Sequence, residues 1–401
     1  MTTKGFADEL KICLEENILP FWMSRMTDPR GGFYGEITGK DILVEDAPKG
    51  AILNARILWS FSAAFRMFGK KEYLTMAERA KRAIIDNFYD KEFGGVFWSL
   101  NPDGTPLDTK KQIYAIGFAI YGLSEFALAT GDPEALEYAT RLYEDIEKHS
   151  CDALNGGYFE AFTREWGQLG DMRLSDKDEN LCKTMNTHLH IIEPYANLMR
   201  VWKDPGLEKS VRRLLDIFLN KIINRDTGHL QLFFDEKWQP SNDAVSYGHD
   251  IEASWLLHEA ALAIGDKSVI SEVEPWVVRI AEAASEGFTP GQGMSYEKHP
   301  DGSIDGDRHW WVQAETVVGY FNIWQHFRKA GALEKSINCW KFIKSNLVDN
   351  ENGEWHWSIR TDGSANLDED KAGFWKCPYH DSRMCLEIIA RAEGDDRNPT
   401  I

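Results

Sequence analysis

Hydrophobic positions along most of the chain recur every three to four residues, which is the period of an amphipathic helix. Short breaks containing glycine, aspartate or proline, such as Gly131-Asp132-Pro133, separate these periodic segments. The pattern predicts twelve helices, over residues 6–23, 50–68, 71–88, 110–130, 133–149, 181–202, 206–223, 249–264, 267–285, 310–329, 333–347 and 378–392.

Glycine-aromatic segments recur between pairs of predicted helices. Six of them begin 60 to 72 residues apart, at Gly31, Gly94, Gly156, Gly228, Gly293 and Gly353. Several continue into turn sequences, as in Asn101-Pro102-Asp103-Gly104 and His299-Pro300-Asp301-Gly302. Turn chemistry of this kind predicts a short β-hairpin in each repeat.

The repeat period constrains the fold. One hairpin with two helices cannot bury its apolar face alone, so successive units must stack on one another. Six such units suit an all-α (α/α)6 barrel with alternating inner and outer helices and the hairpins at one end, although an open solenoid has the same pattern. Because the chain has no linker, low-complexity segment or shift in composition, we expect one closed domain over residues 1–401.

Polar and aromatic residues lie near the start of each helix that follows a hairpin. If these helices form the inner ring, such residues converge at one end of the barrel, where they would line a small-molecule site. For any single one, a structural role is the simpler explanation, and only the recurrence in six repeats favours a site. The residues are Arg56, Tyr114, Asn186, His188, His190, Glu193, His249, Glu252, Trp310, Trp311, Gln313, Glu315, Trp375, His380, Asp381 and Arg383.

Histidines on different helices suggest proton transfer. Two imidazoles on opposite sides of a substrate can remove and return a proton at a carbon beside a carbonyl, because each titrates near neutral pH. The His-x-x-Glu spacing, at His190/Glu193 and His249/Glu252, places a carboxylate on the same helix face.

Three other interpretations use the same residues. The His-x-x-Glu pairs could hold a divalent ion, but they lie on different helices and no cysteine or Asp-rich loop completes a ligand set, so we expect no metal. Glu252 and Glu315 could also serve as the two carboxylates of a glycosidase. A sugar-binding module without catalysis is a third alternative.

The composition of the chain indicates which partners and which cell compartment to expect. The net charge of −19 argues against nucleic acid or an anionic membrane. We find no apolar signal region and no uninterrupted apolar run long enough to cross a bilayer. The six cysteines are scattered without a CxxC pair, as in proteins with reduced thiols. We therefore expect a cytoplasmic protein. We also expect it to be a monomer.

Six motifs spread over the chain belong together. They are GGFYG from Gly31, KG from Lys49 with RILW from Arg56, NTHLHIIEPYANL from Asn186, YGHDIEASW from Tyr247, HWWVQAE from His309 and WKCPYH from Trp375. With these motifs the chain resembles the N-acylglucosamine 2-epimerase superfamily, most closely its members acting on cellobiose-type disaccharides. The resemblance implies an (α/α)6 barrel without a cofactor that converts the reducing-end glucose of a β-1,4-linked disaccharide (cellobiose, lactose or mannobiose) into mannose. An aldose–ketose isomerase acting on mannose is the alternative within the superfamily.

The resemblance also implies roles for the candidate residues. His249 and His380 would be the general acid/base residues at C2, with His380 also assisting opening of the sugar ring. Glu252 would orient His249. Cationic or donor groups would stabilise the developing negative charge of an enediolate, and these would be His190, Asn186, Arg56 and Tyr114. The sugars would stack on Trp311 and Trp375, and Glu315 and Asp178 would accept hydrogen bonds from sugar hydroxyls. Trp310 would complete the pocket wall.

Overall fold

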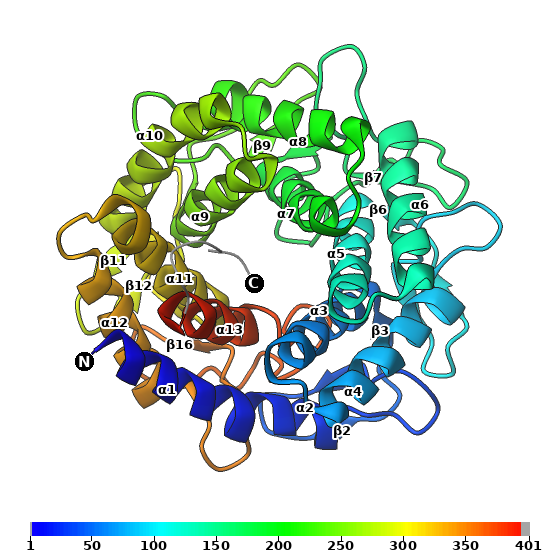
Figure 1. Ribbon diagram of the computed structural model, residues 1–401, viewed down its shortest axis with the longest axis horizontal. Helices are drawn as coiled ribbons and strands as arrows, with labels where there is room; N and C mark the ends of the chain where they lie inside the picture. Colours follow the sequence, from blue (N-terminus) through cyan, green and yellow to red (C-terminus); the bar gives the residue numbers. More distant parts are fainter. Residues whose placement is uncertain (1, 394–401) are drawn as a thin grey trace.

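The computed structural model describes residues 2–393, which form a ring of paired helices (Figure 1). The architecture is the all-α (α/α)6 barrel that the repeat predicts. Neighbouring inner helices contact one another all the way around the ring, and the last contacts the first. The inner helices are α3 (Ala51–Phe68), α5 (Ile113–Thr130), α7 (Met185–Val201), α9 (Tyr247–Ile264), α11 (Trp310–Phe327) and α13 (His380–Glu393).

Outer helices cover the inner ring and bury one face each. In α8, for example, Leu207, Val211 and Leu214 point inward from a helix whose other face is charged. A π-helical turn, Leu14–Ile18, joins α1 to α2, and three other outer helices end in π turns at Ala83–Phe88, Phe218–Ile222 and Ile343–Leu347. The outer elements are α1 (Thr3–Cys13) with α2 (Leu19–Arg25), α4 (Lys71–Arg82), α6 (Pro133–His149), α8 (Pro205–Ile217), α10 (Lys267–Ala284), with a 3₁₀ turn at Ser285–Gly287, and α12 (Ala332–Phe342).

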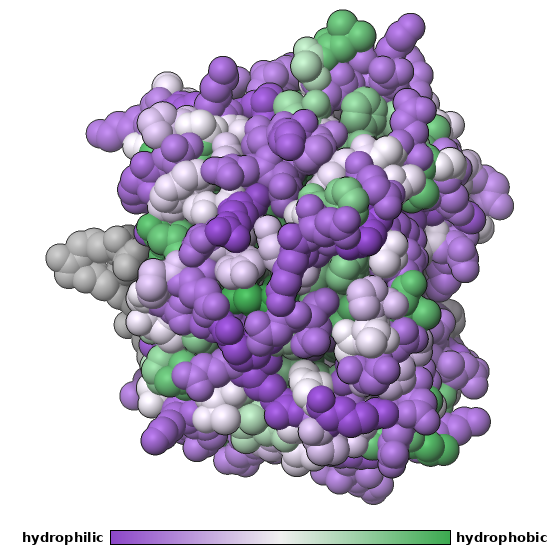
Figure 2. Space-filling model, turned by 90° about the vertical axis from the view of Figure 1, so that its right-hand side faces the viewer, coloured by the Kyte–Doolittle hydropathy of each residue, from purple (hydrophilic) through white to green (hydrophobic). Residues whose placement is uncertain are grey.

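The exterior and interior of the ring differ sharply in polarity. One side of the barrel, seen in Figure 2, is mostly hydrophilic, as expected for the solvent face of outer helices. Helix α5, in contrast, is long and apolar enough to cross a membrane, and 83% of it is buried inside the protein. Its apolar sequence is interrupted by Ser124 and Glu125, so it is not the uninterrupted apolar run whose absence was noted in the sequence. Packing against α3, α6 and α7 explains its composition.

The glycine-aromatic segments form the predicted turns. Each follows an outer helix and is closed by antiparallel pairing, at Thr27–Phe33, Tyr89–Val96, Cys151–Tyr158, Ile223–Leu230 and Val348–Trp355, and between β11 (Phe288–Thr289) and β12 (Gly293–Met294). The predicted hairpins over Asn101-Pro102-Asp103-Gly104 and His299-Pro300-Asp301-Gly302 are also present. They join β4 (Ser99–Leu100) to β5 (Pro106–Asp108) and β13 (Glu297–Lys298) to β14 (Ile304–Asp305).

Short strands also join each repeat to the next. The two residues before each of the inner helices α3, α5, α7, α9 and α11 pair with a strand from the following repeat, and the bridge between Ile37 and Ala372 closes the circle ahead of α13. The paired strands therefore fix where these five helices start, at one end of the barrel. The pairs are β3 (Lys49–Gly50) with β4, β6 (Lys111–Gln112) with β7 (Ala161–Phe162), β8 (Lys183–Thr184) with β9 (Phe233–Phe234), β10 (Val245–Ser246) with β13, and β15 (Arg308–His309) with β16 (Ser358–Ile359), while β1 (Glu36–Ile37) pairs with β2 (Leu43–Val44).

Buried lysine–aspartate pairs fix several of these junctions. Lys111 Nζ lies 2.9 Å from Asp90, and Lys183 Nζ lies 2.6 Å from Asp152. Each lysine precedes an inner helix, and each aspartate follows the outer helix before it. The ammonium group contributes to lowering the pKa of Asp152 to about 2 despite its burial. Removing one partner would leave a buried charge, so these pairs specify where the inner helices begin.

Candidate functional site

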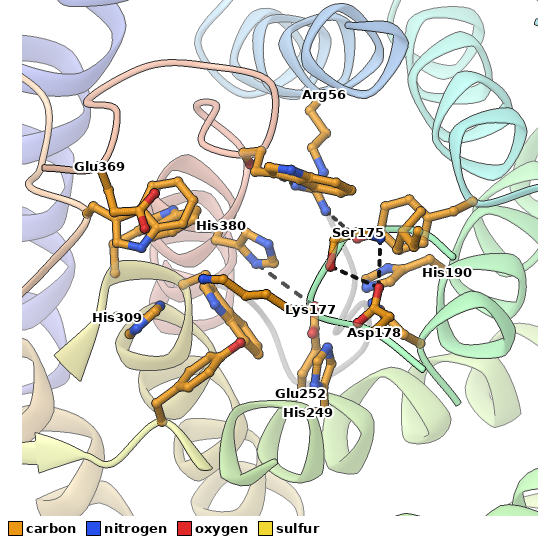
Figure 3. A pocket seen from close by; sticks show the side chains of 18 of the residues that line it. Arg56, Ser175, Lys177, Asp178, His190, His249, Glu252, His309, Glu369 and His380 are labelled. Carbon is orange, nitrogen blue, oxygen red and sulfur yellow. Dashed lines mark hydrogen bonds and ion pairs between the residues drawn. The ribbon is translucent and has the colours of Figure 1, made fainter. Parts of the chain in front are cut away.

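The first turns of the inner helices surround a cavity of about 390 Å³ (Figure 3). Its size is within the range of pockets that hold small molecules. Of the twelve residues to which roles were assigned above, eleven line it, and the twelfth, Glu315, lies behind the wall. Five other residues expected at the opening do not line it, namely His188, Glu193, Gln313, Asp381 and Arg383. The lining residues are Arg56 of α3, Tyr114 of α5, Asn186 and His190 of α7, His249 and Glu252 of α9, Trp310 and Trp311 of α11, His380 of α13, and Asp178 and Trp375 from loops.

His249 is held by a hydroxyl and an indole. Its Nδ1 atom is hydrogen-bonded to Ser246 Oγ at 2.7 Å, and its ring centroid lies 4.8 Å from that of Trp311. A side chain at Gly248 would collide with Trp311, because a Cβ there would lie 2.6 Å from the indole. Burial lowers the pKa of His249 to about 3, and the nearby His190 also lowers it. The imidazole is therefore neutral at neutral pH.

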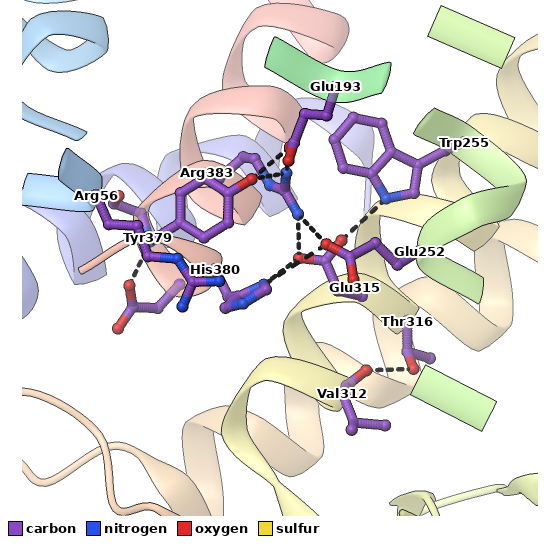
Figure 4. A network of polar contacts seen from close by, with 12 residues as sticks. Arg56, Glu193, Glu252, Trp255, Val312, Glu315, Thr316, Tyr379, His380 and Arg383 are labelled. Atoms are coloured by element: carbon purple, nitrogen blue, oxygen red, sulfur yellow. Dashed lines mark hydrogen bonds and ion pairs between the residues drawn. The ribbon is translucent and has the colours of Figure 1, made fainter. Parts of the chain in front are cut away.

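His380 faces the same indole from another helix. Its ring centroid lies 5.7 Å from that of Trp311, and its Nδ1 atom lies 2.7 Å from Glu315 Oε1 (Figure 4). Burial lowers the pKa of His380 well below its usual value, and the positive charges of Arg56 and Arg383 lower it further. Both imidazoles thus line one cavity with Nδ1 engaged by the protein.

Behind the cavity, Arg383 binds three carboxylates. Its fully buried guanidinium donates to Glu193, to Glu252 Oε1 at 2.7 Å and to Glu315 Oε1 at 2.6 Å (Figure 4). Burial raises the pKa of Glu252 well above its usual value, and the charge of Glu315 raises it further. Burial and the neighbouring charge thus favour the protonated form of Glu252, and the guanidinium of Arg383 opposes them.

Two predicted contacts are wrong. We expected Glu252 to orient His249, but its Oε1 binds Arg383 and lies 3.9 Å from Nδ1 of His380, while Ser246 takes the place beside His249. We also expected Glu315 to face the substrate. Its oxygens instead bind His380, Arg383 and the indole of Trp255, so Glu315 supports the cavity wall from behind.

The opposite wall is cationic and aromatic. Arg56 Nη2 donates to the hydroxyl of Tyr114 at 2.8 Å, and its guanidinium stacks 4.1 Å from the centre of Phe118. His190 packs against Tyr114, with centroids 5.0 Å apart, and its Nδ1 lies 3.0 Å from Glu193. This wall offers donors and a permanent positive charge to an anionic oxygen in the cavity.

Comparison with known proteins agrees with this geometry. The sequence model of the N-acylglucosamine 2-epimerase (GlcNAc 2-epimerase) family matches residues 32–382. The chain belongs to this family.

Its relatives extend the similarity over nearly the whole chain. A cellobiose 2-epimerase of Bacteroides fragilis is 64% identical, covering 95% of this chain and 98% of its own. One from Ruminococcus albus is 39% identical, with coverages of 96% and 98%. The solved cellobiose 2-epimerase structure from Bacillus thermoamylovorans superposes with a TM-score of 0.92 at 37% identity, covering 96% of this chain and 99% of that one. The resemblance seen in the sequence is confirmed, and the protein is a carbohydrate epimerase.

Eight residues of the epimerase cavity wall were not predicted from the sequence. The irregular loop of residues 174–178 crosses the opening (Figure 3) and contributes Leu174, Ser175, Asp176 and Lys177 beside Asp178, whose Oδ2 accepts from Ser175 N at 2.8 Å. Other unpredicted lining residues are Tyr296, His309, Trp357 and Glu369. Tyr296 and Trp357 stand in or next to the glycine-aromatic segments, and a search of both ends of each hairpin would have found them.

One group in the epimerase has the geometry of a metal site. Among the described residues, ligand atoms of Glu252, Glu315 and His380 lie within 4.8 Å of one another. Arg383 already brings a positive charge to both carboxylates, and burial raises the pKa of Glu252 well above its usual value. A guanidinium thus fills the electrostatic role that a cation would have between these oxygens.

Proposed function

We propose that this epimerase inverts C2 of the reducing-end glucose of β-1,4-linked disaccharides, converting cellobiose into glucosyl-mannose and acting on lactose or mannobiose as well. The name of the 64% identical relative supports the choice of substrate. The proposal rests above all on one observation, namely that His249 and His380 line one cavity and contact the same indole of Trp311.

The proposed reaction begins with opening of the pyranose ring, which exposes the aldehyde and makes C2–H acidic. One histidine removes that proton, and the electron pair moves toward O1 to give a cis-enediolate. The other histidine, which takes up the O1 hydroxyl proton during ring opening while solvent protonates O5, delivers that proton to C2 from the opposite face, so that glucose becomes mannose. When the ring closes, the first histidine passes its proton to O1 and O5 releases one to solvent. The exchange requires two bases on different elements, as His249 of α9 and His380 of α13 are.

The developing charge on the enediolate needs positive partners. Arg56 is permanently charged, and burial raises the pKa of Tyr114, so its hydroxyl stays protonated and can donate. Together with His190 and Asn186, they form the wall assigned to the enediolate oxygens. Donors placed where charge develops lower the barrier more than donors to the ground state.

Sugar hydroxyls need acceptors and apolar faces. The buried Oε2 of Glu252 and Oδ1 of Asn186 have no hydrogen-bond partner among residues 2–393, which leaves them for a ligand. Trp311 and Trp375 are assigned as the stacking faces and Asp178 as a hydroxyl acceptor, with Trp310 completing the wall. The expectation of a monomeric, cytoplasmic enzyme stays a prediction.

Incubation with cellobiose, followed by chromatography of the products, tests the proposal. Glucosyl-mannose is the expected product. A ketose disaccharide would indicate the aldose–ketose isomerase, free glucose a glycosidase, and unchanged cellobiose a binding protein or another substrate. Free mannose, assayed in parallel, checks whether a monosaccharide is the better substrate. Any of these other outcomes would replace the proposed function.

A further inference from the structure

Ser246 stands at the N-cap of α9, but its hydroxyl does not cap the helix. A serine in this position ordinarily accepts a hydrogen bond from a backbone N–H of the first turn. Thr184 in α7 and Asp204 in α8 do so. The hydroxyl of Ser246 lies instead 2.7 Å from Nδ1 of His249, and the residue is only 3% exposed. The serine side chain is thus engaged by the imidazole at the expense of the helix cap.

The three histidines that line the cavity from inner helices, His190, His249 and His380, differ in the group that contacts Nδ1. His190 and His380 face carboxylates, Glu193 at 3.0 Å and Glu315 at 2.7 Å. His249 faces an uncharged hydroxyl. A carboxylate favours the protonated ring, whereas a hydroxyl can fix the ring orientation without adding negative charge. His249 is therefore oriented as firmly as the other two but receives less support for an imidazolium.

The surroundings of His249 leave Ser246 as its orienting partner. Glu252, on the same helix, is bound to Arg383, and Trp311 contributes only an aromatic face. From neighbouring elements, His190 of α7 lowers and Glu315 of α11 raises the pKa of His249 through charge alone. A neutral ring without the serine would be free to expose either nitrogen to the cavity.

We propose that Ser246 is the positioning residue of His249, accepting the hydrogen of Nδ1 and so keeping Nε2 as the nitrogen that exchanges the C2 proton. The proposal rests on the proposed function, in which His249 is one of the two acid/base residues. Nδ1 keeps its hydrogen throughout the cycle, and Nε2 alone gains and loses one. The uncharged partner makes the imidazolium of His249 release its proton readily, in contrast to a ring supported by a carboxylate.

Kinetics of three substitutions test this role. Ser246→Ala should lower kcat on cellobiose by up to about a hundredfold with KM little changed, because the base loses its orientation while the sugar contacts remain. Ser246→Thr keeps a hydroxyl and should restore most of the rate. Ser246→Asp places a carboxylate beside Nδ1, so the acidic limb of the kcat–pH profile should move to higher pH.

Ser254→Ala is the matched control. Ser254 is a buried serine of the same helix, and its hydroxyl donates to the Ile251 carbonyl at 2.7 Å, away from any imidazole. This variant should keep the wild-type kcat and pH profile. Wild-type kinetics in Ser246→Ala, an unmoved profile in Ser246→Asp, or an equal loss in Ser254→Ala would each overturn the proposal.

A measurement without substrate separates this proposal from the proposed function. Nitrogen NMR of ¹⁵N-histidine-labelled protein, with the His249 signals assigned from a His249→Gln variant, reports which ring nitrogen carries hydrogen. We expect hydrogen on Nδ1 in the wild type and a mixture of tautomers in Ser246→Ala. An unprotonated Nδ1 in the wild type would contradict the serine's role, whether or not the enzyme epimerises cellobiose.

Discussion

His380 Nδ1 lies 2.7 Å from Glu315 Oε1. Because a carboxylate only accepts hydrogen bonds, this contact fixes the hydrogen on Nδ1 and leaves Nε2 as the other ring nitrogen, free to exchange protons. Arg383 donates to the same oxygen at 2.6 Å and offsets its charge. The carboxylate therefore orients His380, while burial and the nearby guanidinium groups keep its pKa low.

Glu315→Gln removes the charge while keeping the shape of the side chain. We expect kcat to fall by roughly ten- to a hundredfold, because the amide orients His380 less firmly and supports its imidazolium less. Steady-state kinetics on cellobiose would measure the loss. Glu125→Gln is the control, since Glu125 is a buried carboxylate of α5 that pairs with Arg66 at 2.8 Å outside the cavity wall. Equal rates for wild type and Glu315→Gln would remove Glu315 from the account.

Loss of either acid/base imidazole should abolish most of the activity. His249→Ala and His380→Ala are each expected to reduce kcat by roughly 10²- to 10⁴-fold, the range for a positioned general acid or base. Circular dichroism and thermal unfolding would check that both variants fold. If one of them turned over cellobiose at a near wild-type rate, the two-histidine assignment would have to be abandoned.

Glu160 should make stability depend on pH. Its fully buried carboxyl accepts from Thr184 N at 2.7 Å, and burial raises its pKa from 4.5 to about 8. Between these values the folded state holds a proton that the unfolded state releases, so the stabilisation is full below pH 4.5 and is lost as the pH rises toward 8. The change is at most about 1.4 kcal/mol per pH unit.

Glu160→Gln cannot titrate and isolates this effect. Urea unfolding of wild type and variant at several pH values between 5 and 8 would give the difference in their free energies of unfolding. The wild type should lose stability relative to the variant as the pH rises. A difference that stayed constant, or that grew in favour of the wild type, would show that the carboxyl is already ionised in the folded protein.

Metal removal should leave the enzyme active. Arg383 provides the positive charge between Glu252 and Glu315, so the proposed chemistry requires no ion there. After treatment with a chelator and desalting, the rate on cellobiose is expected to equal that of untreated protein. Inactivation that a divalent ion reversed would instead make the Glu252–Glu315–His380 group a metal site.

The fold could be predicted because apolar periodicity and repeat spacing are local signals. The helix predicted over 310–329, for instance, is found as α11, Trp310–Phe327. The pairing of strands between repeats could not be predicted. Lys49 pairs with Leu100, in strands of two residues that carry no alternating pattern of their own. The π turns of the outer helices have no sequence signal either.

The position of the site could be predicted from the sequence, but the hydrogen-bond partners of some of its residues were predicted wrongly. Inner helices start at one end of the barrel, so residues near their starts meet. The shared spacing of His190/Glu193 and His249/Glu252 predicted two pairs, but only the first forms, at 3.0 Å. Arg383, from the far end of the chain, binds Glu252 instead. The spacing of residues along one helix does not show which distant residue competes for a side chain. It does not show the course of an irregular loop such as 174–178 either.

Deuterium incorporation during turnover of cellobiose in D2O tests the central claim most directly. Proton transfer through His249 and His380 predicts that glucosyl-mannose formed in D2O carries deuterium at C2, as read by proton NMR and mass spectrometry. Glucosyl-mannose that retained the original hydrogen at C2 would contradict the account, because the hydrogen would then have moved without passing through an exchangeable imidazole.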